Sequence, residues 1–140
     1  MLYYLAVVGS RSFTDKGYML EVILRYQEKY GLDLVIISGE CPSGGDRLAK
    51  ENALDNGIEY QAYPPRHGKW NQYCEAHPPE YYNQPYNVKY FWERNTEIAE
   101  KCNECIGFVV KGIRANGTMD TINKATKLNK PSMVYFIPQE

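Results

Sequence analysis

Most residues of this chain that could do chemistry lie in three glycine-bearing loops. The loops read Gly9-Ser10-Arg11, then Ser38-Gly39 followed by Gly44-Gly45-Asp46, and finally Asn116-Gly117-Thr118. Glycine lets an anion approach the backbone amides closely, and a helix N-terminus offers unpaired N–H groups with a partial positive charge. Arginine and hydroxyl side chains in these loops would add charge-assisted hydrogen bonds. The three loops together therefore predict a site for a nucleotide phosphate.

A plainer interpretation of each loop stays open, because a tight turn between a strand and a helix needs a glycine in any case. None of the three loops is the GxGxxG dinucleotide fingerprint or the GxxxxGK(S/T) phosphate loop. The sequence therefore supports neither a standard NAD site nor a P-loop NTPase.

Three charged side chains are candidates for a direct role in catalysis. Arg94, which precedes Asn95, is expected either to bind a phosphate or to lie on a solvated helix face. Asp46 is expected either to accept a hydrogen bond from a ribose hydroxyl, as acidic residues do in other nucleotide folds, or to cap a helix. Asp120 is expected either to act as an acid or base, or to complement the dipole of its helix.

Two short motifs have the spacing of zinc ligands. Cys74-x-x-His77 and Cys102-x-x-Cys105 would supply three thiolates and one imidazole, which complete a tetrahedral shell. The interpretation that we favour is a pair of reduced, packed thiols at Cys102 and Cys105, because free cysteine is among the most buried residue types. We therefore expect no bound metal, and we expect His67 and His77 to lie on the surface.

Strands alternate with helices along the chain, and this order must position the loops. Continuous apolar runs that end in glycine are typical of strands buried on both faces, and residues at helical spacing separate them. We predict an α/β, Rossmann-like parallel sheet of about five strands with helices on both faces. In such a sheet, ligands bind at the carboxyl ends of the strands where the strand order reverses. The first helix is expected to be capped by Thr14 and to stop at Gly31. The predicted strands are residues 3–8, 34–37, 58–63, 106–110 and 133–137.

Length and charge limit the classes of protein to which the chain can belong. It has 140 residues, 44% of them hydrophobic, with sixteen Lys and Arg against seventeen Asp and Glu. This length fits one compact domain, expected to span residues 1–140. Without a basic excess, nucleic acid is not an expected partner. No apolar stretch reaches the ~20 residues of a membrane span, and the start lacks the basic region of a signal peptide. We therefore expect a cytoplasmic protein without membrane contact.

A segment at about residues 64–90 interrupts the alternation of strands and helices. It contains five of the eight prolines and both histidines. Its aromatic side chains would form a lid that stacks on a base, an interface between subunits, or a supplement to the core. The aromatic residues in question are Trp70, Tyr73, Tyr81, Tyr82, Tyr86, Tyr90, Phe91 and Trp92.

The loop residues resemble those of the SLOG superfamily of Rossmann-like proteins, which includes the LOG-type phosphoribohydrolases and the DNA-processing protein DprA. The chain looks most similar to small bacterial and phage members with a GSR start, and the likeness spans nearly all of it apart from residues 64–87. The resemblance implies a site for a nucleotide or nucleotide-derived ligand, with Arg94 matching an arginine of the LOG-type enzymes. It rests on Gly9-Ser10-Arg11-Ser12-Phe13, Ser38-Gly39, residues 44–49, Arg94-Asn95 and Gly117-Thr118.

One departure from the LOG-type pattern bears on catalysis. Those enzymes carry Pro-Gly-Gly-x-Gly-Thr-x-x-Glu, whereas residues 114–121 of this chain read Arg-Ala-Asn-Gly-Thr-Met-Asp-Thr. Thr121 stands in the place of the catalytic glutamate, and a threonine cannot serve as a carboxylate base. We therefore predict a binding protein with a sensor or accessory role and no required cofactor. The alternative is an N-glycosidic hydrolase acting on a nucleoside monophosphate or an ADP-ribose-like substrate, with Arg94 on the phosphate and Asp120 or Asp46 as acid or base.

The resemblance also bears on the partners of the protein. SLOG relatives commonly assemble, so it implies a homo-oligomer whose small-molecule partner is a nucleotide. A DprA-like role on single-stranded DNA is disfavoured by the balanced charge. The predicted ligand-binding residues are Gly9, Ser10, Arg11, Ser38, Gly39, Gly44, Gly45, Asp46, Arg94, Asn95, Asn116, Gly117 and Thr118.

Overall fold

Five parallel strands form one sheet in the computed structural model, which describes residues 1–39, 41, 43–65, 85 and 87–138. The spatial order is β3-β2-β1-β4-β5, so the strand order reverses between β1 and β4. This confirms the predicted parallel α/β sheet of Rossmann-like type. The strands are β1 (Tyr3–Gly9), β2 (Leu34–Ser38), β3 (Glu59–Ala62), β4 (Glu104–Val110) and β5 (Ser132–Ile137).

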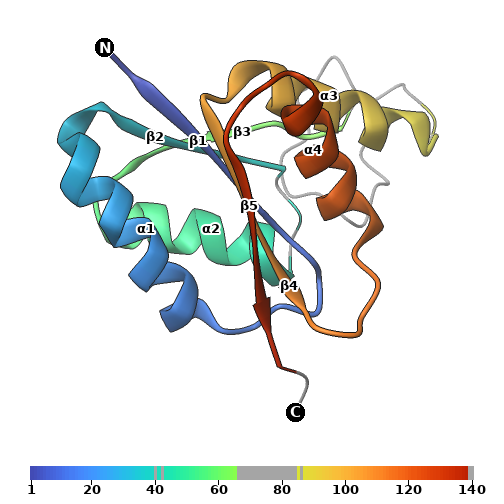
Figure 1. Cartoon of the computed structure of the whole chain (residues 1–140), viewed down its shortest axis with the longest axis horizontal. Helices are drawn as coiled ribbons and strands as arrows, with labels where there is room; N and C mark the ends of the chain where they lie inside the picture. Colours follow the sequence, from blue (N-terminus) through green and yellow to red (C-terminus); the bar gives the residue numbers. More distant parts are fainter. Residues whose placement is uncertain (40, 42, 66–84, 86, 139–140) are drawn as a thin grey trace.

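Four helices cover the two faces of this sheet. Figure 1 shows α1 and α2 on one face and α3 and α4 on the other. A 3₁₀ turn, η1 (Gly31–Asp33), leads from α1 into β2. The helices are α1 (Lys16–Tyr30), α2 (Gly44–Asp55), α3 (Lys89–Lys101) and α4 (Asn116–Lys127).

The central strand β1 is buried on both faces because its side chains alternate between two hydrophobic cores. Leu5 and Val7 belong to the core under α1 and α2, whereas Ala6 and Val8 belong to the core under α3 and α4. All four side chains are at most 4% exposed. Burying an aliphatic side chain contributes roughly 1.5–3 kcal/mol, so this strand gives the loop at its carboxyl end a firm support.

The start of α1 differs by one residue from the predicted cap at Thr14. Asp15 is the N-cap, and its carboxylate accepts a hydrogen bond from the amide of Tyr18 at 3.0 Å. An aspartate satisfies a first-turn amide at least as well as a threonine does, which explains the shift. The predicted stop at Gly31 is confirmed, since α1 ends at Tyr30 and Gly31 adopts a φ of 57°.

The amino end of the sheet is closed by a polar network. Glu104, at the start of β4, accepts hydrogen bonds from the hydroxyls of Tyr3 and Tyr26, both at 2.5 Å. The ring of Tyr3 also stacks on that of Tyr30, with 3.8 Å between the centroids. Burial and the bond to Glu104 raise the pKa of both Tyr3 and Tyr26 above the ordinary value of 10.0. Charge-assisted bonds of this kind tie β1, β4 and α1 together.

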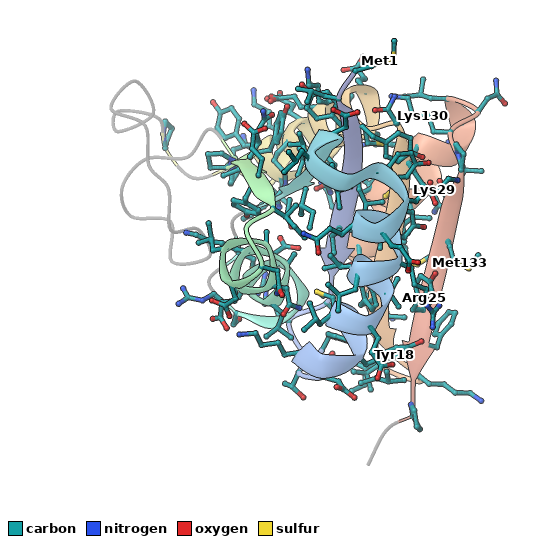
Figure 2. All side chains as sticks on the ribbon, turned by 90° about the vertical axis from the view of Figure 1, so that its left-hand side faces the viewer. Met1, Tyr18, Arg25, Lys29, Lys130 and Met133 are labelled. Carbon is teal, nitrogen blue, oxygen red and sulfur yellow. The ribbon has the colours of Figure 1, made fainter. Side chains whose placement is uncertain are left out.

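The outer face of α1 leaves a shallow hollow against β5, the edge strand. The hollow has a volume of about 240 Å³ and is lined by Val22, Arg25, Tyr26, Lys29 and Tyr135. Figure 2 views the molecule with α1 in front. No helix in the described ranges is long and apolar enough to cross a membrane.

Candidate functional site

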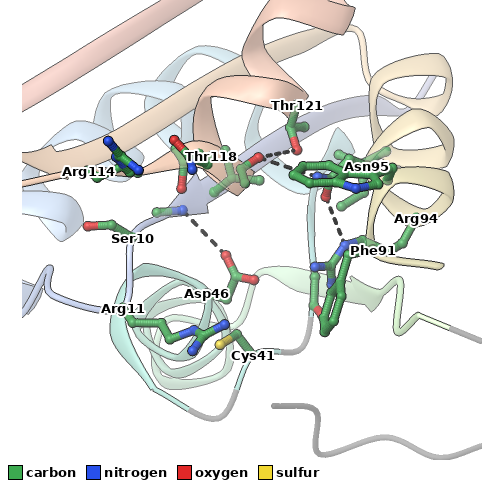
Figure 3. A pocket seen from close by; sticks show the side chains of 18 of the residues that line it. Ser10, Arg11, Cys41, Asp46, Phe91, Arg94, Asn95, Arg114, Thr118 and Thr121 are labelled. Carbon is green, nitrogen blue, oxygen red and sulfur yellow. Dashed lines mark hydrogen bonds between the residues drawn. The ribbon is translucent and has the colours of Figure 1, made fainter. Parts of the chain in front are cut away.

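The main cavity lies where the strand order reverses, at the carboxyl ends of β1 and β4. It has a volume of about 580 Å³, within the usual range for small-ligand sites. Its walls come from the loops after β1, β2 and β4, the first three turns of α3 and the start of α4. Parallel α/β sheets place ligands at this point because the loops on either side diverge there. Figure 3 shows the cavity with Asp46 and Arg11 on one side and Thr118 and Arg114 on the other.

The N-terminus of α4 forms one wall and has no side-chain cap. Its N-cap residue is Ala115, so the first amides of the helix lack the partner that a Ser, Thr, Asn or Asp would supply. Thr118 lies in this first turn, lines the cavity and is only 7% exposed. A methyl group of Thr118 packs toward Gly107 of β4, and within the described part of the chain its hydroxyl has no hydrogen-bond partner. The wall therefore offers unpaired donors to the cavity.

Gly117, in the same turn, has open space where a side chain would stand. A Cβ atom built on it would meet no atom of another described residue within 4 Å. Its φ is not positive, so neither backbone conformation nor packing requires a glycine at this position. The missing side chain leaves room beside the helix amides.

Gly9, Gly44 and Gly45 serve a different purpose, which is close packing of the backbone. A Cβ on Gly45 would lie 2.3 Å from the Cα of Gly9, so α2 approaches the end of β1 only because both residues are glycine. Gly44 has a φ of 72° and sits against the backbone of Arg11. The amide of Gly45 donates to the carbonyl of Ser10 at 2.9 Å and is therefore already bonded. Close backbone packing and the positive φ of Gly44 explain why these three positions are glycine.

Asp46 is a buried carboxylate at the edge of the cavity. It lies in the first turn of α2, after the N-cap Ser43, so it is not itself the cap. Only 8% of the residue is exposed, and its Oδ1 accepts a hydrogen bond from the amide of Gly9 at 3.3 Å. Burial raises the pKa of Asp46 above its usual range, while the charge of Arg94 and the amides of Gly9 and Cys41 act in the opposite direction.

Arg94 on α3 holds two other segments by their backbone carbonyls. Its Nη1 donates to the carbonyl oxygen of Gly39, after β2, and to that of Tyr63, after β3, the latter at 3.4 Å. Its Nε donates to the side-chain oxygen of Asn95 at 2.9 Å, and its guanidinium lies 5.5 Å from the centre of the Phe91 ring. The guanidinium borders the cavity, but these bonds already use part of its donor capacity.

Asp120 and Thr121 do not present a carboxylate to the cavity. Asp120 accepts a hydrogen bond from Asn95 at 3.1 Å and forms an ion pair with Lys124 at 2.8 Å, and it is not among the lining residues. Thr121 lines the cavity, and its hydroxyl donates to the carbonyl of Gly117 at 3.2 Å. The bond from Asn95 to Asp120 links α3 to α4. Asp46 is the one carboxylate that lines the cavity among the residues described.

An apolar wall faces the polar one, and most of it was not assigned to the site from the sequence. Its members on α3 recur at helical spacing around Arg94. This spacing predicted a helix here, but it did not indicate which side of the helix faces the cavity. Phe91 and Trp92 had been predicted only as part of the aromatic segment. The apolar lining residues are Val8, Val88, Phe91, Trp92, Ile98 and Ile113, and further lining residues not predicted to bind the ligand are Ser12, Cys41, Arg114, Ala115 and Thr121.

The structure brings most of the predicted ligand-binding residues to one cavity. Three of them, Ser38, Gly44 and Gly45, do not line it. The hydroxyl of Ser38 donates instead to the carbonyl of Val7 at 2.6 Å. The predicted residues that do line the cavity are Gly9, Ser10, Arg11, Gly39, Asp46, Arg94, Asn95, Asn116, Gly117 and Thr118.

Of the three cysteines that the structure describes, Cys41 lines this cavity, whereas Cys102 and Cys105 do not. Cys102 and Cys105 are buried free thiols, and burial raises the pKa of both. Cys74 and His77 fall outside the described residues, as do His67 and most of the segment at 64–90. Among the residues described, no group of three or more His, Cys, Asp or Glu side chains could hold a metal ion.

Comparison with known proteins agrees with the arrangement of the loops. A family model described as the YspA, cpYpsA-related SLOG family matches residues 4–72, which include β1, β2, α2 and β3 with the first two loops of the cavity. No curated protein and no solved structure matched the chain. This match and the Rossmann-like sheet that carries the loops support membership of the chain in the SLOG superfamily.

Proposed function

We propose that the protein binds a nucleotide or a nucleotide-derived ligand in this cavity, with a phosphate group at the N-terminus of α4. The observation that carries the proposal is Thr118, a residue only 7% exposed whose hydroxyl has no hydrogen-bond partner among the described residues, beside the open space at Gly117. A helix N-terminus by itself contributes only about 0.3–1 kcal/mol to the binding of an anion. A hydrogen bond from a side chain to a charged oxygen adds about 1.5–3 kcal/mol, so the side chains supply most of the affinity.

The side chains near this wall fit a phosphate group. Ser10 and Ser12 bring their hydroxyls within 3.0 Å of each other at the end of β1, and both line the cavity. Arg11 and Arg114 line the same cavity from separate loops. Hydroxyls and guanidinium groups on two sides of an uncapped helix turn form a donor-rich wall, which is the chemistry that a phosphate requires.

We assign the protein a sensor or accessory role and not the reaction of the LOG-type enzymes. The position of their catalytic glutamate is Thr121, whose hydroxyl is bonded to the helix backbone. The neighbouring Asp120 is paired with Asn95 and Lys124 and does not line the cavity. Neither residue supplies a carboxylate beside a bound sugar.

Calorimetric titration of the purified protein with AMP, ADP-ribose, NAD and cyclic nucleotides tests the proposal. At least one of these ligands should bind with a measurable Kd, and Thr118→Val should weaken that binding about tenfold or more by removing one hydrogen bond to a charged group. Thr126→Val is the matched control, because Thr126 lies on the same helix but not in the cavity. No binding of any ligand at millimolar concentration would overturn the proposal.

A second candidate, N-glycosidic hydrolysis, is favoured by one observation, the buried Asp46 with its raised pKa at the cavity wall. A carboxyl group of this kind suits a general acid. Release of free base from AMP by the wild-type protein, lost in Asp46→Asn, would support hydrolysis over binding alone. The homo-oligomer implied by the family stays a prediction, which light scattering on the purified protein measures.

A further inference from the structure

We infer that Asp46 is the acceptor for the hydroxyl groups of the ligand's sugar, so that the site selects ribonucleotides over their deoxy counterparts. The inference rests on the proposed nucleotide binding and names the part of the ligand that meets α2. It assigns to this carboxylate a specificity role that is separate from the phosphate contacts at α4.

The first step is the position of the carboxylate. Asp46 lines the cavity from the side opposite Thr118, as Figure 3 shows. Its Oδ1 is held by the amide of Gly9, which fixes the orientation of the group. Its Oδ2 would lie 2.8 Å from a Cβ on Gly39, and the guanidinium of Arg94 would lie equally near. Because Gly39 has no side chain, both charged groups reach the cavity wall at this point.

The second step is the chemistry that a buried carboxylate accepts. A phosphate beside Asp46 would bring two negative charges together in a poorly solvated place, which is unfavourable. Hydroxyl groups are donors without charge. An ionised carboxylate has about four lone-pair sites, and the amides of Gly9 and Cys41 with the hydroxyl of Ser38 use at most three of them. The wall at Asp46 therefore suits the sugar, while the wall at Thr118 suits the phosphate.

The third step is the order of the walls. Ser10 lies on one side of the cavity and Phe91 on the other, toward α3, while Asp46 lies between these two residues and across from Thr118 in Figure 3. A nucleoside phosphate has the same order of groups, namely phosphate, sugar and base. An aromatic side chain at the far end would stack on the base, whatever its identity. The ring hydroxyls of the sugar then fall next to Asp46.

The experiment compares AMP with 2′-deoxy-AMP and 3′-deoxy-AMP, measured by calorimetry on the wild-type protein. We expect AMP to bind about tenfold to a hundredfold more tightly than at least one deoxy form, the loss expected when a hydrogen bond to a charged group is removed. Asp46→Asn should weaken the binding of AMP and bring it close to that of the deoxy form. Asp55→Asn is the matched control, since Asp55 lies on the same helix, away from the cavity.

Each outcome decides between the two proposals. Equal binding of AMP and both deoxy forms overturns the role of Asp46 but leaves nucleotide binding intact. An Asp46→Asn variant that binds all three ligands more weakly by the same factor has the same meaning. Affinity that changes with the base and not with the sugar would mean that Asp46 reads an exocyclic amine, which also overturns the inference. Failure of every nucleotide to bind overturns the proposed function as well. The wild-type comparison decides the matter even if Asp46→Asn does not fold.

Discussion

The two ends of the sheet each hold a carboxylate in a shielded position, yet the two carboxylates have different surroundings. At the amino end, Glu104 accepts two short hydrogen bonds, from Tyr3 and Tyr26, and it lines neither cavity. At the carboxyl end, Asp46 is bonded by the amide of Gly9 and borders a cavity of about 580 Å³. The first carboxylate is enclosed by the protein itself, whereas the second has partners within the fold and also lines the cavity.

This difference teaches how a structural polar group can be told from a binding group without a ligand present. A buried polar group that serves the fold is expected to find its partners within the fold. Where partners are missing beside a cavity, as at Thr118, the missing partner is expected from outside. Four substitutions test this contrast between the closed amino end and the open carboxyl end.

Gly45→Ala should have the largest effect, because it pushes a methyl group into the backbone at the end of β1. The new Cβ would lie 2.3 Å from the Cα of Gly9, where no flexible side chain can yield. We expect a loss of about 3 kcal/mol or more in the free energy of unfolding, at the upper end of the range for overpacking. Denaturant unfolding monitored by circular dichroism measures it. A stable Gly45→Ala protein would contradict the packing role given to this glycine.

Glu104→Gln should destabilise the amino end without affecting the cavity. The amide nitrogen cannot accept a hydrogen bond, so one of the tyrosine hydroxyls loses its acceptor and the other keeps only a neutral one. The expected loss is about 1.5–3 kcal/mol at neutral pH. Nucleotide affinity, measured on the folded variant, should stay within twofold of the wild type. A large loss of affinity would mean that the two ends are coupled.

Gly117→Ala should separate stability from binding. The position lies in the first turn of α4 with open space around it, so alanine should raise the free energy of unfolding by about 0.5–1 kcal/mol. The added methyl group should nevertheless weaken the binding of a phosphate-bearing ligand about tenfold. Gly17→Ala is the matched control, because Gly17 is also the second residue of its helix, α1, and has nearly open space around it. It should gain similar stability and keep full affinity.

Asp46→Asn should have the smallest effect on stability, and its sign is informative. Because burial raises the pKa of this carboxyl in the folded state, the folded protein holds the proton more tightly than the unfolded chain does. The free energy of unfolding therefore falls as the pH rises from below 3.8, the ordinary pKa of an aspartate, through the pKa of the folded state. At neutral pH the charge on Asp46 destabilises the folded protein. Thermal unfolding should give a higher Tm for the variant at pH 7, and this difference should vanish near pH 3. A lower Tm at pH 7 would mean that Arg94 outweighs the cost of burial.

Much of the fold could be predicted from the sequence because its signals are local. Apolar runs such as Leu34–Ser38 need no long-range information to be recognised as buried strands. The site was predicted less completely, because its contacts join residues that are far apart in the sequence. Arg94 was identified as a phosphate ligand or a surface residue, whereas its guanidinium bonds the carbonyls of Gly39 and Tyr63. Those partners lie 55 and 31 residues away along the chain, so nothing near Arg94 in the sequence marks them.

The sequence by itself determined the alternation of strands and helices, and with it the edge of the sheet at which the three loops meet. Only the tertiary structure decided which glycine serves which purpose. Gly9 and Gly45 stand 36 positions apart and yet touch, while Gly117 faces open space. In the sequence these glycines look alike, because each follows a strand. What distinguishes them is the atom that a side chain would meet, and that depends on how α2 and α4 pack on the sheet.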